Sequence, residues 1–238
     1  MKTTLYRSET RGHERHGWLD ARHTFSFANY YDPNRIHFGA LRVLNDDIIE
    51  GGKGFGTHGH DNMEIITIPL EGNLHHQDSL GHGGVIKTGD VQVMSAGSGI
   101  KHSEYNGENE QTLNLFQIWV FPNKKNVQPR YEQKTLDFWN KKNKLHEIVP
   151  PTPSENALWI HQDAWFSIGE FDNNKGESYT LKSDKNGVFV MVIEGSFNVS
   201  GIDLNRRDGL GISDVDKLEI KSLSDNARIL LMEVPMQI

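Results

Sequence analysis

The sequence contains no cysteine among its 238 residues. Disulfide bonds and thiolate metal sites are therefore excluded, and any metal ion must be held by histidine, aspartate or glutamate. Proline is also scarce, with 8 residues against 23 glycines. Together with a hydrophobic fraction of 36%, this composition indicates a folded, turn-rich chain rather than a disordered one.

Long apolar runs and clusters of basic residues are missing as well. The longest apolar runs, FQIWVF and VFVMVI, have the length of a strand and are too short to span a membrane. The N-terminal stretch MKTTLYRSETRGHERHG lacks the apolar core of a signal peptide. A net charge of −7 argues against nucleic acid as a partner, since phosphate binding requires clustered lysine and arginine. We expect a soluble cytoplasmic protein that binds neither membrane nor nucleic acid.

Short runs rich in β-forming residues recur along the chain, with turn residues between them. In the first half they include IHFGALRVL, MEIITIPLEGNLHHQ and LNLFQIWVF. This rhythm predicts an all-β fold, an antiparallel barrel or sandwich. The pattern lapses after Phe121, through a polar, lysine-rich segment ending in PPTP, and then resumes. We therefore predict an N-terminal domain over residues 1–122, a connecting segment over 123–155 and a C-terminal domain over 156–238.

Two stretches of the chain have the same pattern. EIITIPLEGNLHHQ and VFVMVIEGSFNVSG each consist of an apolar strand, a Glu-Gly turn and a second, alternating strand, which predicts one hairpin used twice. Aligning Gly72 with Gly195 gives an offset of 195 − 72 = 123 residues, and no histidine lies between Tyr179 and Ile238. If the halves are duplicated, only the first can hold a metal through histidine.

Two pairs of residues in the first half have the spacing of metal ligands on strands. His58 and His60 are two residues apart and therefore point to the same face of a strand, and His102 and Glu104 repeat this arrangement. On neighbouring strands of a barrel, the pairs would direct three imidazoles and a carboxylate to one point. This donor set suits one divalent transition metal, and Fe, Mn, Ni, Co, Cu and Zn are all acceptable. Four protein ligands leave positions open for substrate or dioxygen, as a catalytic site requires.

These motifs resemble those of a known family. The run from Gly52 to Glu64 resembles the first motif of the cupin superfamily, and the run from Gly89 to Asn106 resembles a lengthened second motif. The segments LDARHTFSFANYYDP, HGHDNMEIITIPLEG, HHQDSLGHGG and MSAGSGIKHSEYN resemble the pirin family, in particular bacterial pirin-like proteins described as quercetin 2,3-dioxygenases. The resemblance implies a bicupin of two antiparallel β-barrel (jelly-roll) domains, with a metal in the N-terminal barrel and a C-terminal barrel that has no ligands.

The resemblance also implies a ligand set. Carried over to this sequence, the ligands are His58, His60, His102 and Glu104, and iron is the metal we expect first. Glu64 occupies the place of the carboxylate ligand of many cupins, but pirins resemble a variant in which the second-motif carboxylate binds the metal. The lengthened second motif, with a glutamate two residues after its histidine, favours Glu104. Glu64 is then expected behind the ligands, where it could orient a ligating histidine.

Other histidines and aromatic residues have less specific contexts. His75 and His76 point to opposite faces of a strand, so that at most one approaches the cavity, and we expect hydrogen-bonded or exposed roles for them. An N-terminal aromatic group is expected in the core, with a lid over the barrel as the alternative; it consists of Phe25, Phe27, Tyr30 and Tyr31.

The resemblance implies a function, with two alternatives. The implied function is a metal-dependent dioxygenase that cleaves a quercetin-like flavonol with dioxygen and releases carbon monoxide. Glu104 would be the catalytic base that accepts the proton of the substrate hydroxyl. One alternative is a redox-sensing metalloprotein that regulates an unidentified protein partner, and the other is a different small-molecule cupin enzyme.

Overall fold

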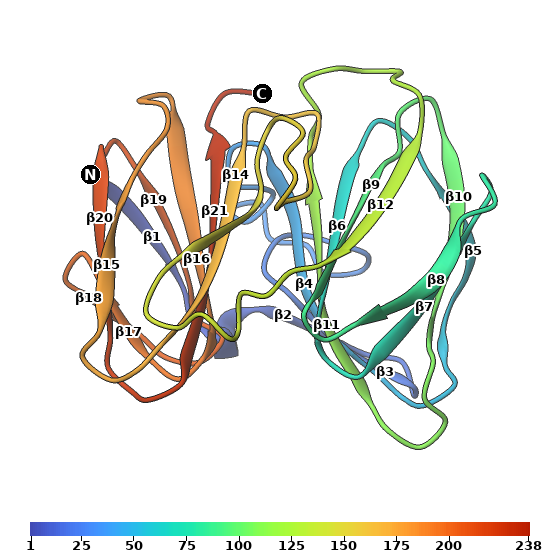
Figure 1. Ribbon diagram of the computed structural model, residues 1–238, viewed down its shortest axis with the longest axis horizontal. Coiled ribbons are helices and arrows are strands. Elements are labelled where there is room, and N and C mark those ends of the chain that lie inside the picture. The colour runs from blue at the N-terminus through green and yellow to red at the C-terminus, as the bar shows by residue number, and fades with distance from the viewer.

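Two β-barrels lie side by side in the computed structural model, which describes residues 1–238 (Figure 1). Besides 21 strands, the chain contains one short 3-10 helix, η1 (Ser8–Thr10), and no helix that is long and apolar enough to cross a membrane. Each barrel combines a large sheet that faces the other barrel with a four-stranded outer sheet. The predicted all-β bicupin fold is confirmed.

The N-terminal barrel is built from antiparallel pairs only. Its large sheet contains, in spatial order, β12 (Arg130–Thr135), β9 (Asp90–Ser95), β6 (Glu64–Glu71), β11 (Leu113–Val120), β4 (Leu41–Ile49), β3 (Leu19–His23) and β2 (Gly12–Arg15). Its outer sheet contains β5 (Gly54–His60), β10 (Ile100–Asn106), β7 (Asn73–Asp78) and β8 (Gly83–Lys87).

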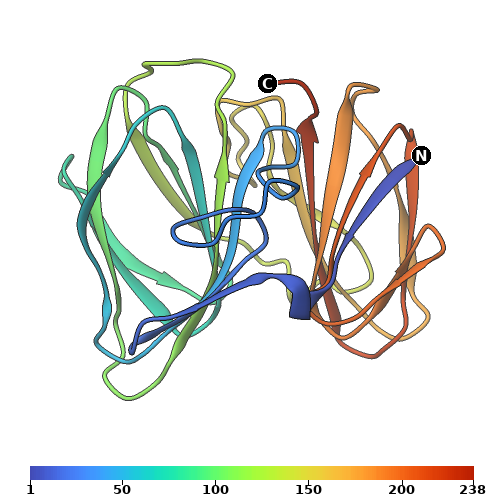
Figure 2. The ribbon, with the colours of Figure 1, turned by 180° about the vertical axis from the view of Figure 1, so that it is seen from behind.

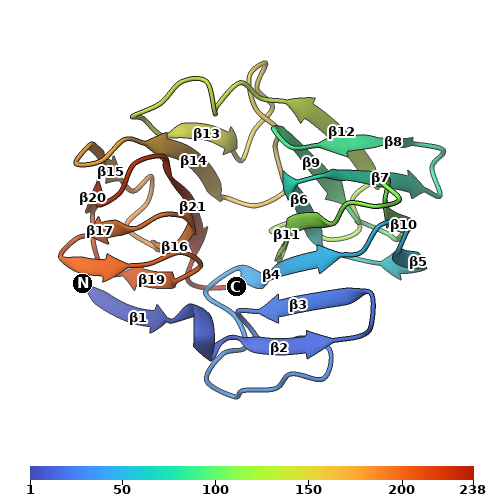
Figure 3. The same ribbon diagram turned by 90° about the horizontal axis from the view of Figure 1, so that it is seen from below.

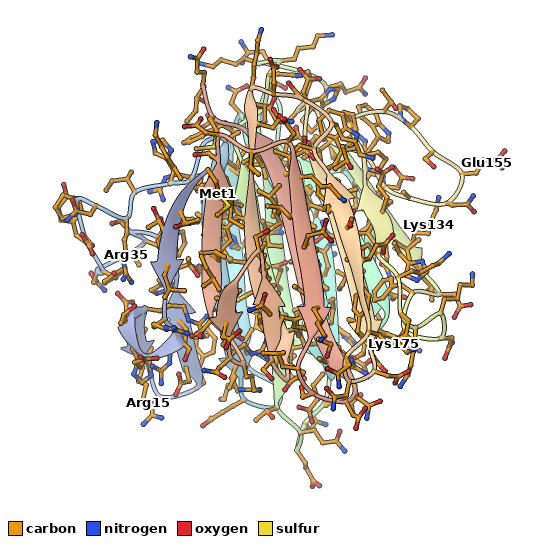
Figure 4. The ribbon with its side chains drawn as sticks, turned by 90° about the vertical axis from the view of Figure 1, so that its left-hand side faces the viewer. Met1, Arg15, Arg35, Lys134, Glu155 and Lys175 are labelled. Atoms are coloured by element: carbon orange, nitrogen blue, oxygen red, sulfur yellow. The ribbon has the colours of Figure 1, made fainter.

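The C-terminal barrel is antiparallel as well. Its large sheet contains β1 (Lys2–Tyr6), β19 (Gly209–Ser213), β16 (Asn186–Glu194), β21 (Ala227–Pro235), β14 (Trp165–Phe171) and β13 (His146–Val149). Its outer sheet contains β15 (Gly176–Thr180), β20 (Lys217–Ser222), β17 (Phe197–Val199) and β18 (Ile202–Leu204). Figure 4 views this barrel from its outer side, with Met1 at the edge of its strands.

The largest hydrophobic core lies between the two barrels. It is a cluster of 27 buried residues that takes side chains from both large sheets, among them Phe116 of β11 and Phe189 of β16. Strand β16 reads NGVFVMVIE, and its alternate side chains point to opposite faces of the sheet, both of which are buried. Phe189 and Met191 join the core between the barrels, whereas Val188 and Val190 fill the C-terminal barrel. The continuous apolar run of this strand follows from its two buried faces.

The two barrels do not follow the predicted boundaries of the domains. Strand β1, within the predicted N-terminal domain, pairs with β19 of the C-terminal barrel, and the chain then crosses to the N-terminal barrel (Figures 2 and 3). The predicted connecting segment contains β12, which extends the N-terminal sheet, and β13, which extends the C-terminal sheet. All three are edge strands that pair on one side only. The edge strands of each barrel therefore include residues that lie outside its predicted boundaries.

The repeated hairpin is confirmed. β6 and β16 are central strands of the large sheets, and each is followed by a strand of the outer sheet, β7 or β17. Gly72 and Gly195 occupy the two turns with φ of 83° and 72°. Glycine adopts this left-handed backbone without steric cost, which explains the shared Glu-Gly turn.

Candidate metal centre

Strands β5 and β10 bring three histidines together. The two strands are antiparallel neighbours, and His58 lies directly opposite His102. The ring centroids of these two histidines are 4.4 Å apart, and the His60 centroid lies 4.9 Å from each of them. One ring nitrogen of each histidine lies within 4.8 Å of the others. The three imidazoles therefore converge on one point, as their spacing predicts.

The nitrogen atoms of these rings suit metal binding. His58 Nδ1 lies 2.9 Å from the carbonyl oxygen of Gly56, which only accepts, so Nδ1 carries a proton and Nε2 is the nitrogen left for a metal. His60 Nε2 and His102 Nε2 are 2.9 Å apart. Burial lowers the pKa of His60 to about 4 and that of His102 to about 2. Both rings are therefore neutral at pH 7, which is the form that binds a metal.

Glu104 lies in the same cavity but outside the cluster of three histidines. It is two residues after His102 on β10 and is 3% exposed. Gln117 Nε2 donates a hydrogen bond to Glu104 Oε2 at 3.0 Å, whereas Oε1 has no hydrogen-bond partner. Burial raises the pKa of Glu104 to about 7. One carboxylate oxygen is thus fixed and the other is available.

The expectation for Glu64 is wrong. Its carboxylate accepts a hydrogen bond from Ser95 Oγ at 2.7 Å and another from the backbone of His161, and it makes none to the three clustered histidines. A turn that contains Asn62, with φ of 44°, separates β5 from β6, so the alternation of faces does not continue from His60. On β6, Ile65 lines the cavity, and Glu64 therefore points to the opposite side.

The cavity beside the histidines has a volume of about 430 Å³ and a largely apolar wall. Phe27 packs edge-on against Trp119, with centroids 5.3 Å apart, and Trp119 packs against His60 at 4.8 Å. Trp18, Phe55 and Ile65 complete the wall. Of the N-terminal aromatic group, Phe25 is buried in the core between the barrels, Phe27 lines the cavity and Tyr31 is exposed.

Sequence reasoning missed three polar residues of the cavity, Asn45, Asp47 and Gln117. Asp47 is buried on β4, its Oδ1 has no hydrogen-bond partner, and burial raises the pKa of its carboxyl well above the usual range. The side chain of Gln117 also bonds to Thr67 Oγ1, at 3.1 Å. The available signal was the alternation of β4 and β11, which places polar residues at positions that face into the barrel.

His76 also lies beside the cluster. It is 3% exposed, its ring centroid is 5.2 Å from that of His102, and it stacks on Tyr131 at 4.6 Å. Neither of its ring nitrogens has a hydrogen-bond partner, and burial lowers its pKa to about 4. His75 is exposed. The prediction that at most one of the two adjacent histidines approaches the cavity agrees with this arrangement, but His76 is neither hydrogen-bonded nor exposed, so the role expected for it is wrong.

Comparisons with known proteins give matches along almost the whole chain. The Pirin family model matches residues 5–120, and the model of the quercetinase C-terminal cupin domain matches residues 147–234. A protein of Escherichia coli (strain K12) named quercetin 2,3-dioxygenase is 42% identical over 231 residues, 97% of this chain and 98% of that protein. A pirin-like protein of Caulobacter vibrioides is 42% identical over 217 residues, 91% of this chain and 93% of that protein.

A solved structure of a pirin is also similar to this chain over its full length. The crystal structure of the bacterial pirin YhhW from Escherichia coli, in complex with nickel(II), matches with a TM-score of 0.93 and 40% identity and covers 100% of both chains. The chain therefore belongs to the pirin family.

Proposed function

We propose that this protein is a metal-dependent dioxygenase that cleaves a quercetin-like flavonol and releases carbon monoxide. The observation that carries the proposal is the convergence of three imidazoles in the wall of a largely apolar cavity. Two further findings support it: relatives named quercetin 2,3-dioxygenase and the nickel(II) complex of a similar pirin. In this proposal His58, His60, His102 and Glu104 hold one divalent transition metal.

The residues of the site fit such an ion. The Gly56 carbonyl engages His58 Nδ1, which leaves Nε2 for the ion, and His60 and His102 are neutral. Glu104 Oε1, buried and without a partner, supplies the fourth donor. When bound, the metal supplies Lewis acidity, which lowers the pKa of a substrate hydroxyl, and open positions for substrate and dioxygen.

The cavity wall positions the substrate and excludes water. Trp18, Phe27, Phe55 and Trp119 present apolar rings around a space of about 430 Å³, within the size range of small-molecule sites. A planar, polycyclic flavonol matches this wall in shape and polarity. The aromatic side chains keep bulk water away, which strengthens every polar interaction at the reacting centre.

Glu104 is the proposed catalytic base. Gln117 holds Oε2, so Oε1 is the oxygen that would accept the proton of the substrate hydroxyl. A pKa raised to about 7 by burial suits this task, because proton transfer is most efficient when the pKa of the base is near the working pH. The overall reaction is balanced, since both atoms of dioxygen enter the products and one ring carbon leaves as carbon monoxide.

The test is turnover with defined metals. The chain is loaded under anaerobic conditions with Fe, Mn, Ni, Co or Cu, and quercetin loss, oxygen uptake and carbon monoxide are then measured together. We expect equal amounts of all three for at least one metal, and loss of turnover in His58→Ala but not in His75→Ala, whose side chain is exposed. Activity no higher than that of free metal, for every metal, would contradict the flavonol reaction.

A further inference from the structure

A second cavity, of about 400 Å³, lies at the junction of the two barrels. Four arginines line it: Arg11 after η1, Arg22 on β3, and Arg206 and Arg207 in the turn between β18 and β19. Figure 2 shows the N-terminal segment with η1 crossing between the barrels in this region. The cavity is distinct from the one beside the histidines and shares no lining residue with it.

Two buried guanidinium groups share one carboxylate in this cavity. Asp46 Oδ2 lies 3.2 Å from Arg11 Nη2 and 3.5 Å from Arg207 Nε. The side chains of Arg11 and Arg207 are only 4% and 6% exposed. Asp46 Oδ1 accepts a hydrogen bond from Asn114 Nδ2 at 2.9 Å. Asp46 is therefore the carboxylate that both buried guanidinium groups share.

The buried arginines have unused donors. Nη1 of Arg11 and Nη1 of Arg207 have no hydrogen-bond partner, and burial lowers the pKa of both groups. Arg207 also lies 3.6 Å from Glu194, but that carboxylate is 39% exposed and accepts a closer bond from Arg206. A buried guanidinium with incomplete pairing is costly, so the site gains from a further anion.

The remaining two arginines lie at the rim of the cavity. Arg22 is paired with Asp46 in the ladder between β3 and β4, so their side chains share a face. Arg22 lies 3.7 Å from Asp20 and Arg206 lies 2.7 Å from Glu194, but the two arginine side chains are 36% and 58% exposed and remain accessible to a ligand. The lining also contains Glu9 and Asp20, but Asp20 is already held by Arg15 and His13 from outside the cavity.

We propose that this cavity binds a phosphate group, free or as the phosphomonoester of a small molecule. Guanidinium groups match the oxygens of phosphate in pairs and are less strongly hydrated than ammonium groups, so several arginines around one cavity favour this ligand. The site contrasts with the net charge of −7 of the chain. Because Arg11, Arg22 and Arg207 come from segments of both barrels, the bound phosphate ties the barrels together and stabilises their junction.

The experiment is calorimetric titration of the metal-loaded full chain with inorganic phosphate and, separately, with glycerol phosphate, at constant ionic strength. We expect saturable binding and a higher melting temperature. The rim variant Arg22→Ser/Arg206→Ser, chosen because both side chains are exposed, should lose about tenfold or more in affinity. Phosphate that binds at the metal would be unaffected by this variant, so the difference reports on the arginine cavity.

A matched control removes the same charge elsewhere. Lys2→Ser/Lys217→Ser replaces two exposed basic residues outside the cavity and should leave the affinity unchanged. Equal losses in both double variants, or a melting temperature that rises no more than with sodium chloride of the same ionic strength, would overturn the proposal. Tighter binding of glycerol phosphate than of inorganic phosphate would identify an ester as the ligand, and the reverse order would identify the free ion.

Discussion

The interiors of the two barrels differ in chemistry although they use the same hairpin and the same arrangement of sheets. The C-terminal barrel is filled by a cluster of 15 buried residues, which includes Phe171 and Phe197. The N-terminal barrel has two smaller apolar clusters, of 7 and 4 residues, and buries His76, His102 and Glu104 besides. One barrel thus contributes apolar packing, whereas the other gives up part of its core to a site.

Two buried glutamates show the same difference in detail. Glu233, in the C-terminal barrel, accepts hydrogen bonds from Tyr179 Oη at 2.7 Å, from the backbone of Lys182 at 2.8 Å and from Asn186 Nδ2 at 2.7 Å. Glu104, in the N-terminal barrel, accepts one, from Gln117. A carboxylate whose oxygens are both engaged supports the structure, whereas one with a free oxygen can bind an ion or a proton.

Removing a clustered histidine should have the largest effect. We expect His60→Ala to weaken metal binding more than about 100-fold, because changing even the partners that orient metal ligands costs 10- to 100-fold. The barrel should stay folded, since the core between the barrels is intact. Competition with a chelator measures the affinity, and His75→Ala is the matched control. Metal affinity that is unchanged in His60→Ala would contradict the assignment of this residue.

Truncation of the C-terminal core should come next. Phe197 is fully buried and packs edge-on against Phe171, with centroids 5.9 Å apart. We expect Phe197→Ala to lower the free energy of unfolding by about 3–5 kcal/mol, measured by urea denaturation.

The matching substitution in the N-terminal barrel is at Gln92, which is buried with no hydrogen-bond partner for its amide. Gln92→Leu should lower the free energy of unfolding by less than about 1 kcal/mol. A larger loss for Gln92→Leu than for Phe197→Ala would reverse the comparison of the two interiors.

Glu64 provides a pH-dependent effect of intermediate size. Burial raises its pKa from 4.5 to about 7, so between these values the folded chain holds a proton that the unfolded chain has released. Its contribution to stability is therefore complete below pH 4.5 and is lost as the pH rises through 7. Relative to Glu64→Gln, the wild type should lose about 1.4 kcal/mol per pH unit across this window. Parallel stability curves for the two proteins would show that Glu64 ionises normally.

The smallest effect is expected at Gln117. Gln117→Leu removes the donor to Glu104 Oε2 and frees that carboxylate to rotate. We expect metal affinity to fall about tenfold and catalytic turnover to fall with it, while KM for quercetin changes little, because Gln117 acts through Glu104. Gln117→Glu, which cannot donate when ionised, should resemble the leucine variant. A KM effect alone would instead make Gln117 a direct substrate contact.

The sequence predicted the histidine cluster because strand spacing is local. His58 and His60 share a face at any position of a strand, and the same holds for His102 and Glu104. The rule does not extend across a turn. Glu64 was placed from the resemblance and not from strand spacing, and the alternation restarts on β6 after the turn that contains Asn62, so that Glu64 bonds to Ser95 and not to the histidines.

Other features depend on contacts between distant segments. β1 and β12 are edge strands whose pairing partners, β19 and β9, are not their neighbours along the chain, and β13 pairs with β14 across the predicted domain boundary. The short sequences of these strands do not specify their partners. The inward position of Asp47 and Gln117 also becomes meaningful only when β4 and β11 are paired, with Leu115 opposite Asp47 and Gln117 opposite Asn45.

X-ray absorption spectroscopy tests the central claim, that the N-terminal barrel holds one metal through three histidines, most directly. The wild-type chain is loaded with one equivalent of nickel(II), and the His58→Ala/His102→Ala variant is treated in the same way. The wild-type spectrum should require about three imidazole nitrogens together with oxygen donors, and the double variant should retain no tightly bound nickel. A wild-type spectrum without imidazole scattering, or nickel retained in the variant with an unchanged spectrum, would contradict the claim.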